Sequence, residues 1–494
     1  MRISRLLIAL MATWSPLVSA QIQQAWVAKY NNSITNGNHQ ALKMSLDSAG
    51  NIYMLGVSAN ANTNTGYVVV KYAPNGNQLW AARYDSTNFP TAAPTGFALD
   101  GNSNIVVTGS AVTVKYAANG NQLWTAPYNA QSVAVDAAQN IYITGVLSNF
   151  TTVKLDPAGS NIWTVTKSSS QGQSISQVIA VDSSTNVYVA GGENLLVAPY
   201  GYALLGVLKY DRNGTRLWED DLIGGGTPAY AQAVGIIIDK SENVYLECNF
   251  TIGAISGAYA MTKIYPDGSA DWQAYDPTDD SASLASSFGI DSLGNIVVTG
   301  GNDYNYPNNM YGTYKINTNG NYVWSNTYPT VVTGNSIATS IAVDPANSVY
   351  VTGFSPSLGT NRDSDIVTIK YDSPGNQVWL QRYDGPAHEN DAGNAIAVDN
   401  SGNVYVAGYE TETNGFTSMI LIKYSPVTLQ QQPNGNFILH ASGSPGETFD
   451  IQASTNLQTW QDLGSITADT NGIALFEDTN APLFPNRFYY AAPK

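Results

Sequence analysis

Few residues in this chain are of the types that carry out catalysis or bind metals. It has three histidines, His39, His388 and His440, and one cysteine, Cys248. One thiol cannot build a disulfide framework or a cysteine-ligated metal site, and three scattered histidines do not form a histidine-rich one. The members of a Ser-His-Asp triad can be far apart in the sequence. However, no Gly-x-Ser-x-Gly elbow occurs where a strand leads into a helix. We therefore predict no catalytic residues, no metal site and no cofactor.

Two acidic segments faintly resemble calcium-binding loops. They are Asp211-Arg-Asn-Gly214 and Asp276-Pro-Thr-Asp279-Asp280. Neither has the alternating oxygen ligands and the closing glutamate of a complete loop. Solvated charge is the default interpretation of both.

The composition narrows the class of protein further. The chain has 494 residues, with 21 Lys and Arg against 37 Asp and Glu, a formal net charge of -16. That charge repels a phosphate backbone, so we predict no nucleic-acid partner. Residues 1–20 combine basic Arg2 and Arg5, a short apolar run and Val18-Ser-Ala20, the pattern of a secretory signal peptide cleaved near Ala20. We expect a secreted, extracellular or periplasmic monomer with no membrane span, because no stretch reaches the roughly 20 apolar residues required.

Two phrases recur along the remainder of the chain. The first is an Asp followed nine residues later by Gly, as in Asp47 to Gly56, with Asn51 between them. It begins eight times, at Asp47, Asp100, Asp136, Asp182, Asp239, Asp291, Asp344 and Asp399. Cys248 takes the place of the glycine once, which predicts a small buried residue. The second phrase is a Lys followed by Gly five and Trp nine residues later, as in Lys71, Gly76 and Trp80.

The second phrase is offset at the two ends of the repeat region. Lys423 has no Trp after it, whereas Trp26-Val-Ala-Lys-Tyr30 near the start matches Trp80-Ala-Ala-Arg-Tyr84. Alternating β-branched and aromatic residues around Asp, Asn and Gly turns predict a β-hairpin for each phrase. Two hairpins per unit, repeated every 36 to 57 residues, are typical of propeller blades. The offset predicts a ring in which the Trp26 strand completes the unit of Lys423.

These phrases predict an all-β protein, an eight-bladed β-propeller over residues 21–427 closed by its N-terminal strand, with seven blades as the alternative. We expect a linker at 428–435. Five strand-like runs in residues 436–494 predict a small β-sandwich of the immunoglobulin or fibronectin kind.

The repeat unit resembles a known family. Ile341-Ala-Val-Asp344, Asn403-Val-Tyr-Val-Ala-Gly408 and Leu421-Ile-Lys-Tyr424 resemble the SBBP β-propeller repeat of secreted bacterial proteins. The resemblance implies the propeller fold and export, and its name implies seven blades. It implies no catalytic residues. The C-terminal module, through segments such as Arg487-Phe-Tyr-Tyr490, resembles C-terminal modules of secreted bacterial proteins.

Repetition separates framework residues from candidates for function. A residue type present in every unit is best explained by folding: Asp accepting backbone hydrogen bonds in its turn, Trp packing between blades, Lys lying opposite carboxylates. The Asp-to-Gly and Lys-to-Trp spacings are constant. Length varies only in the Gly-to-Lys connections and in the connections from Trp to the next Asp, which emerge on one face of the ring. Because binding residues favour variable loops on a rigid scaffold, we place candidate binding residues there: Tyr200, Tyr202, Asn302, Asp303, Tyr304, Tyr306, Arg362, Asp363, His388, Glu389 and Asp391.

The expected function is a secreted, non-enzymatic scaffold that binds a protein or polysaccharide partner through this variable loop face. The alternative is a propeller enzyme. One form of this alternative is a quinoprotein dehydrogenase, because its tryptophan-docking repeat is similar to Lys370-Tyr-Asp-Ser-Pro-Gly-Asn-Gln-Val-Trp379. The other form is a polysaccharide-acting enzyme. The quinoprotein family commonly has adjacent cysteines, which this chain lacks. Solvated loops without a ligand are the third interpretation.

Overall fold

A computed structural model describes residues 22–146, 150–167, 174–195, 202–222, 228–252, 255–275, 284–305, 308–328, 334–357, 363–443, 446–456, 458–470, 472–484 and 487–493. The regular structure of these ranges is β-strand, apart from the short helix η1 (Ala481–Leu483). The predicted all-β class is confirmed. The predicted signal peptide lies outside the described residues. In the described ranges, no helix is long and apolar enough to cross a bilayer.

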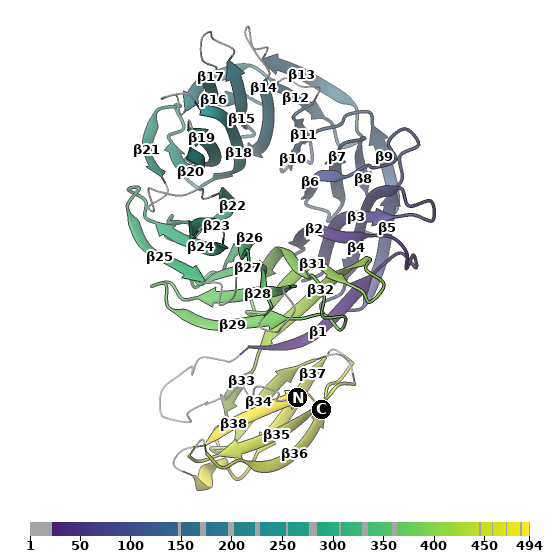
Figure 1. The fold of residues 1–494 in the computed structure, drawn as a ribbon, viewed down its shortest axis with the longest axis vertical. Helices are drawn as coiled ribbons and strands as arrows, with labels where there is room; N and C mark the ends of the chain where they lie inside the picture. Colours follow the sequence, from purple (N-terminus) through teal and green to yellow (C-terminus); the bar gives the residue numbers. More distant parts are fainter. Residues whose placement is uncertain are drawn as a thin grey trace.

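In the described ranges, eight four-stranded antiparallel sheets, here called blades 1 to 8, stand around a common axis (Figure 1). Each of blades 1 to 7 runs in chain order from an innermost to an outermost strand. Blades 1 to 4 consist of β2 (His39–Leu46), β3 (Ile52–Ala59), β4 (Thr65–Tyr72) and β5 (Gln78–Tyr84); β6 (Pro94–Leu99), β7 (Ile105–Gly109), β8 (Thr113–Tyr116) and β9 (Gln122–Ala126); β10 (Ser132–Val135), β11 (Ile141–Thr144), β12 (Phe150–Leu155) and β13 (Asn161–Lys167); and β14 (Ser174–Val181), β15 (Val187–Leu195), β16 (Tyr202–Tyr210) and β17 (Arg216–Leu222).

Blades 5 to 8 continue the ring with the same strand order. They consist of β18 (Pro228–Ile238), β19 (Val244–Ile252), β20 (Ile255–Ile264) and β21 (Ala270–Tyr275); β22 (Leu284–Ile290), β23 (Ile296–Asn305), β24 (Asn308–Ile316) and β25 (Tyr322–Tyr328); β26 (Ile337–Val343), β27 (Val349–Pro356), β28 (Ser364–Tyr371) and β29 (Gln377–Tyr383); and β30 (Ala392–Val398), β31 (Val404–Thr411), β32 (Thr417–Pro426) and β1 (Ile22–Tyr30). The N-terminal strand β1 is therefore the outermost strand of blade 8, as predicted.

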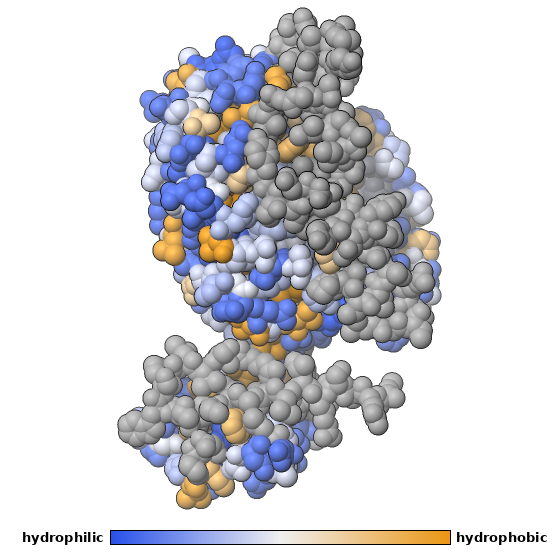
Figure 2. All heavy atoms as spheres, turned by 60° about the vertical axis from the view of Figure 1, so that its left-hand side comes forward, coloured by the Kyte–Doolittle hydropathy of each residue, from blue (hydrophilic) through white to orange (hydrophobic). Residues whose placement is uncertain are grey.

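Burial differs between the middle and outer strands of a blade. The middle strands β3 and β4 are almost entirely buried, because each blade packs against a neighbour on both faces, and they read as continuous apolar runs. The outer strands alternate, and they expose apolar residues such as Leu79 and Leu123, 51% and 53% exposed. On the side drawn in Figure 2, hydrophobic residues form small separate groups among hydrophilic ones.

The repeat Asp organises its own turn. In blade 1, Oδ1 of Asp47 accepts the N–H groups of Ala49 and Asn51 at 3.0 and 2.9 Å. Oδ2 accepts the Asn51 side-chain amide at 2.8 Å and the Tyr53 hydroxyl at 3.1 Å, and the Lys71 ammonium lies 3.7 Å away. The bond from the backbone N–H four residues on recurs at Asp100, Asp136, Asp182, Asp239, Asp291, Asp344 and Asp399. The predicted structural role of the Asp is confirmed.

The repeat Trp joins each blade to the next. Trp80 lies on Gly120 of blade 2, whose φ is +89°, and a Cβ at Gly120 would lie 2.8 Å from Cδ2 of the indole. The indole N–H donates to the Ala118 carbonyl in the same turn at 3.0 Å. Only glycine combines this positive φ with so close an approach. The pairing recurs as Trp124/Gly159, Trp163/Gly214, Trp218/Gly268, Trp272/Gly320 and Trp324/Gly375, which confirms the predicted packing between blades.

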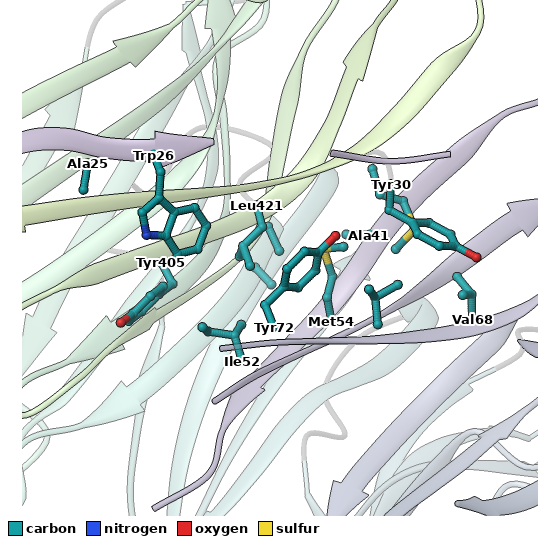
Figure 3. Close-up of a cluster of buried hydrophobic side chains, with 14 residues drawn as sticks. Ala25, Trp26, Tyr30, Ala41, Ile52, Met54, Val68, Tyr72, Tyr405 and Leu421 are labelled. Carbon is teal, nitrogen blue, oxygen red and sulfur yellow. The ribbon is translucent and has the colours of Figure 1, made fainter. Parts of the chain in front are cut away.

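The same contact closes the ring. Trp26 of β1 lies opposite Lys423 of β32, as Trp80 lies opposite Lys71 within blade 1. A Cβ at Gly76 of blade 1 would be 2.9 Å from Cδ2 of Trp26. Figure 3 shows Trp26 beside Tyr405 of blade 8, in a cluster that continues into blade 1 and includes Ala25, Tyr30, Ala41, Ile52, Met54, Val68, Tyr72 and Leu421.

A small β module follows blade 8. Two three-stranded sheets, β33–β34–β37 and β36–β35–β38, share a buried cluster that includes Leu439, Phe449, Ile451 and Tyr489. Their strands are β33 (Thr428–Gln431), β34 (Phe437–Ser442), β35 (Thr448–Ser454), β36 (Gln461–Thr467), β37 (Ile473–Asp478) and β38 (Phe488–Pro493). All five predicted strand runs contain a strand, and the segment expected to be a linker contains β33. The immunoglobulin-like or fibronectin-like identity stays a prediction.

One buried position departs from the repeat in its chemistry. Glu247 of β19 is fully buried, and neither carboxyl oxygen has a hydrogen-bond partner among the described residues. The equivalent positions hold Leu55, Ala190, Ala407 and, in the other four blades, threonine. Burial raises the pKa of Glu247 well above its usual value. The neighbouring Cys248 is also buried, as predicted, and burial raises the pKa of its thiol to about 12.

Alanine substitution at Gly76 tests the closure contact. At a positive φ, alanine costs about 1–2 kcal/mol from backbone strain alone. Gly415→Ala supplies that strain alone, because Gly415 has a φ of +79° and nothing within 4 Å of a Cβ. We expect Gly76→Ala to lower the free energy of unfolding in urea by about 1–3 kcal/mol more than Gly415→Ala, because its Cβ meets Trp26. Equal losses would show that Trp26 does not rest on Gly76.

Removing the carboxyl of Glu247 should stabilise the protein. We expect Glu247→Leu to raise the free energy of unfolding at pH 7 by about 1–3 kcal/mol, because a buried polar group without a partner costs that much. The folded state holds the proton more tightly than the unfolded state, so the wild type should lose stability as the pH rises above the usual glutamate pKa, and the variant should lose less. The reciprocal Leu55→Glu should destabilise blade 1. Urea unfolding from pH 5 to 9 measures all three, and identical curves for wild type and Glu247→Leu would contradict the prediction.

Candidate functional site

The loop face carries a groove where the ring closes. Three connections meet there: residues 31–38 between β1 and β2, 384–391 between β29 and β30, and 412–416 between β31 and β32; we call them the closure surface. Asn414 donates its amide to the Thr35 carbonyl at 2.7 Å. The first and third connections, with Thr417 and Ser418, line a groove of about 190 Å³. Its described lining residues are Asn31, Ile34, Thr35, Gly37, Glu412, Thr413, Asn414, Phe416, Thr417 and Ser418.

A half-buried arginine lies on the blade 7 side of this surface. Arg382 of β29 donates to Oδ2 of Asp365 at 2.7 Å and to the Pro356 carbonyl at 3.0 Å. It also donates to the Tyr328 hydroxyl of blade 6 at 3.1 Å. Burial raises the pKa of Asp365, and the Arg382 guanidinium opposes that rise. The network fixes blade 6, β27, β28 and β29 relative to one another, so it positions the surface and does not itself face a ligand.

A second network reaches the groove. Glu410 of β31 is buried, accepts a hydrogen bond from the Tyr383 hydroxyl and pairs with Lys29 of β1. The Lys29 ammonium also lies 3.6 Å from Glu412 in the groove wall. Although burial lowers it, the contacts with Glu410 and Glu412 raise the pKa of Lys29 above its usual value. A charged lysine therefore connects the closing strand to the groove.

Four predicted binding residues are described at or near this surface. His388 is largely exposed, with Nδ1 2.7 Å from Oδ2 of Asp384, and this contact raises its pKa. Glu389 beside it is exposed. The half-buried Asp363 precedes β28, where its backbone carbonyl accepts the Ser357 N–H at 2.6 Å. The structure thus places His388 and Glu389 within one connection and Asp363 just before a strand.

Asp391 was predicted as an exposed binding residue, and that prediction is wrong. Its side chain is completely buried, and its oxygens accept the backbone N–H groups of Gly385 at 2.5 Å and Thr411 at 3.0 Å. Burial raises the pKa of Asp391 to about 7, against the effect of these two bonds. The residue holds the 384–391 connection onto β31. It is structural, and it orients the exposed neighbours His388 and Glu389.

Other predicted binding residues lie in strands or outside the described ranges. Asn302, Asp303 and Tyr304 were expected in an irregular loop but belong to β23, which pairs with β24 as far as Asn305 opposite Asn308. Tyr202 begins β16. The extra residues lengthen the central hairpins because their backbone groups continue the ladder. Tyr200, Tyr306 and Arg362 lie outside the described residues.

His39 and Asp211, which the sequence analysis considered as possible metal ligands, have structural roles. His39 begins β2 and is buried between the Ser58 hydroxyl and the Ile34 carbonyl, at 2.8 and 2.9 Å. Burial lowers the pKa of His39. Asp211, the start of one calcium-like segment, accepts the N–H groups of Asn213 and Thr215 in a tight turn. The segment 276–280 lies outside the described ranges, within which no three His, Cys, Asp or Glu residues gather as metal ligands would.

The sequence interpretation missed Lys29, Arg382, Tyr383 and Glu410. Each lies in or at the end of a repeat strand, where a framework role was assumed. A partial signal exists for Glu410, because it follows Gly408 by two residues and the equivalent positions of six other blades are uncharged, whereas blade 4 holds Glu193. In the structure the Glu410 carboxylate is buried, and its partners are Lys29 and Tyr383.

Comparisons with known proteins agree with this architecture. Residues 385–415, which include much of the closure surface, match the β-propeller repeat family SBBP. Residues 64–198 match the family of the outer membrane protein assembly factor BamB. A WD repeat-containing protein, L264 of Acanthamoeba polyphaga mimivirus, is 25% identical over 223 residues, which are 40% of this chain and 15% of that protein. The chain thus spans well under two thirds of that relative.

Solved structures also resemble the chain. The Pan2 WD40 domain of Neurospora crassa is 13% identical, with a TM-score of 0.41, covering 68% of this chain and 90% of that one. PorZ, a bacterial surface component of the type-IX secretion system of Porphyromonas gingivalis, is 10% identical, with a TM-score of 0.40, covering 86% and 67%. The described structure is a β-propeller, and residues 385–415 of it match the SBBP β-propeller repeat.

Proposed function

We propose that this chain is a secreted, non-enzymatic scaffold that binds a protein or polysaccharide partner through its loop face. The observation that carries the proposal is that, among the described residues, the repeated side chains serve the fold and the non-repeated ones are exposed on the loop face. The repeat Asp, Lys and Trp side chains make contacts within and between blades, as at Asp47 and Trp80. Exposed, irregular polar residues such as His388 and Glu389 stand at the groove-bearing closure surface.

The geometry of the closure surface suits recognition. Asp391 holds the 384–391 connection in place through Gly385 and Thr411, so its exposed side chains are presented with little freedom. A pre-ordered surface loses less conformational entropy on binding than a mobile one. The signal-peptide pattern supports export. We also propose that the protein is a monomer. The domain limits, 21–427 for the propeller and 436–494 for the C-terminal module, belong to the same proposal.

Charge reversal at Glu389 tests recognition through this surface. The mature chain is presented to a glycan array and to envelope proteins of the source organism, and the affinity of any binder is then measured by biolayer interferometry. We expect Glu389→Lys to weaken binding at least about fivefold, a change of about 1 kcal/mol typical of an interface residue. Ala138→Lys, which adds a positive charge to an exposed tight turn between β10 and β11, should leave it unchanged. Absence of any binder, or equal affinities for the two variants, would contradict the proposal.

A further inference from the structure

A polar cavity lies on the axis of the ring, apart from the closure surface. Its volume is about 610 Å³, within the roughly 300–1,000 Å³ typical of small-ligand sites. It is lined by the innermost strands of blades 1 to 5 and the residue before β10, through Lys43, Thr95, Gln131, Ser132, Ile175, Gln177, Val178, Ile179, Gln232, Ala233, Val234, Gly235 and Ile236. Hydroxyl and amide groups therefore face a space large enough for one or two sugar residues.

The wall of this cavity is held by bonds between neighbouring blades. The Thr95 hydroxyl donates to the Ala130 carbonyl at 2.6 Å. The Ala233 N–H donates to Oε1 of Gln177 at 2.7 Å. The bond from Ala233 uses the Gln177 side-chain oxygen and does not involve the Gln177 side-chain N–H groups. Together the two bonds hold the Thr95 and Gln177 side chains in place. The wall is thus a built polar surface on rigid strands, the kind of support that a precise binding site requires.

Lys43 gives the cavity its charge. The eight innermost strands β2, β6, β10, β14, β18, β22, β26 and β30 contain no other Lys and no Arg, Asp or Glu. Lys43 follows a bulge in β2, where the register shifts between Ala41 and Lys43, and bulges redirect side chains. Among the described residues, its ammonium has no hydrogen-bond or ion-pair partner. The repeat lysines differ, because Lys115 pairs with Asp100 at 3.0 Å and Lys315 with Asp291 at 2.9 Å.

We propose that the axial cavity binds a small, hydroxyl-rich carboxylate, an acidic sugar, whose carboxylate pairs with the Lys43 ammonium. A charge-assisted bond inside a partly desolvated cavity is among the stronger polar contacts. Gln131, Ser132 and Gln177 offer groups that hydrogen-bond sugar hydroxyls. The site is separate from the loop-face function and does not rest on it.

The electrostatics of Lys43 are consistent with this assignment. The ammonium is solvent-accessible but surrounded by protein, and this desolvation lowers the pKa of Lys43 with no opposing charge to raise it. A bound carboxylate supplies the missing opposite charge, so binding should raise the pKa of Lys43 again.

Calorimetry with the mature chain tests the proposal. The probes are digalacturonate, its neutral counterpart galactobiose, galactose 1-phosphate and inorganic phosphate. We expect digalacturonate to bind about tenfold or more tightly than galactobiose, the scale of one charge-assisted contact. Lys43→Met should abolish that preference, Lys43→Arg should keep part of it, and Lys240→Met, at an exposed turn, should leave it unchanged. Equal binding of the acidic and neutral sugars, full binding by Lys43→Met, or tighter binding of either phosphate probe would overturn the proposal.

A second measurement does not depend on how well Lys43→Met folds. Wild-type protein is acetylated with an amine-reactive ester, and the extent of reaction at Lys43 and Lys240 is read by mass spectrometry. Digalacturonate should slow acetylation of Lys43 at least about tenfold and leave Lys240 unaffected, because only the neutral amine reacts and a bound carboxylate favours the protonated form and covers the nitrogen. Equal reaction at Lys43 with and without digalacturonate would overturn the proposal.

Discussion

The contact between an indole ring and a glycine of the next blade is the constraint on which the rest of this structure depends. A blade alone cannot bury both faces of its middle strands, so each needs a fixed neighbour. Trp80 supplies one by covering Gly120 and donating to the Ala118 carbonyl. The constant spacing from Lys to Gly to Trp places each glycine in the turn that receives the preceding Trp, and each Trp opposite the Lys of its own blade. The contact sets the separation of the blades and leaves the opposite connections free to change.

Ring closure follows from the same contact. β1 comes from the far end of the repeat region, yet it places Trp26 on Gly76 with the geometry found between sequential blades. The closing pair therefore keeps the ring-on-glycine packing of the other blade contacts, but the Trp26 indole N–H is buried without the carbonyl partner, among the described residues, that Trp80 has. Closure also accounts for the closure surface, because the strand that completes blade 8 carries Lys29 to Glu410 and Glu412. Ring closure thus brings the charged side chains of Lys29, Glu410 and Glu412 together at the loop face.

The repeat phrases made the strands, the turns and the role of the N-terminal strand predictable, because each phrase combines turn chemistry with a fixed spacing. The site was less predictable for two physical reasons. An inserted polar segment reads the same whether it forms a loop or extends a hairpin, and Asn302 to Tyr304 extend one. Burial of a polar residue depends on distant backbone donors, as for Asp391, whose partners are the N–H groups of Gly385 and Thr411. Neither donor has a signature in the sequence.

The informative residues are those that break the repeat, and three of them show different consequences of one rule. Glu247 places a carboxyl where other blades hold apolar residues or threonine, and in that enclosed position it has no partner among the described residues. Asp391 is equally buried but accepts two backbone bonds, so it serves the fold. Lys43 is also unpaired, but it faces a cavity that can admit a ligand. Because an unpaired charge costs little where a partner can reach it and much where none can, access rather than burial separates a candidate binding residue from a defect in the scaffold.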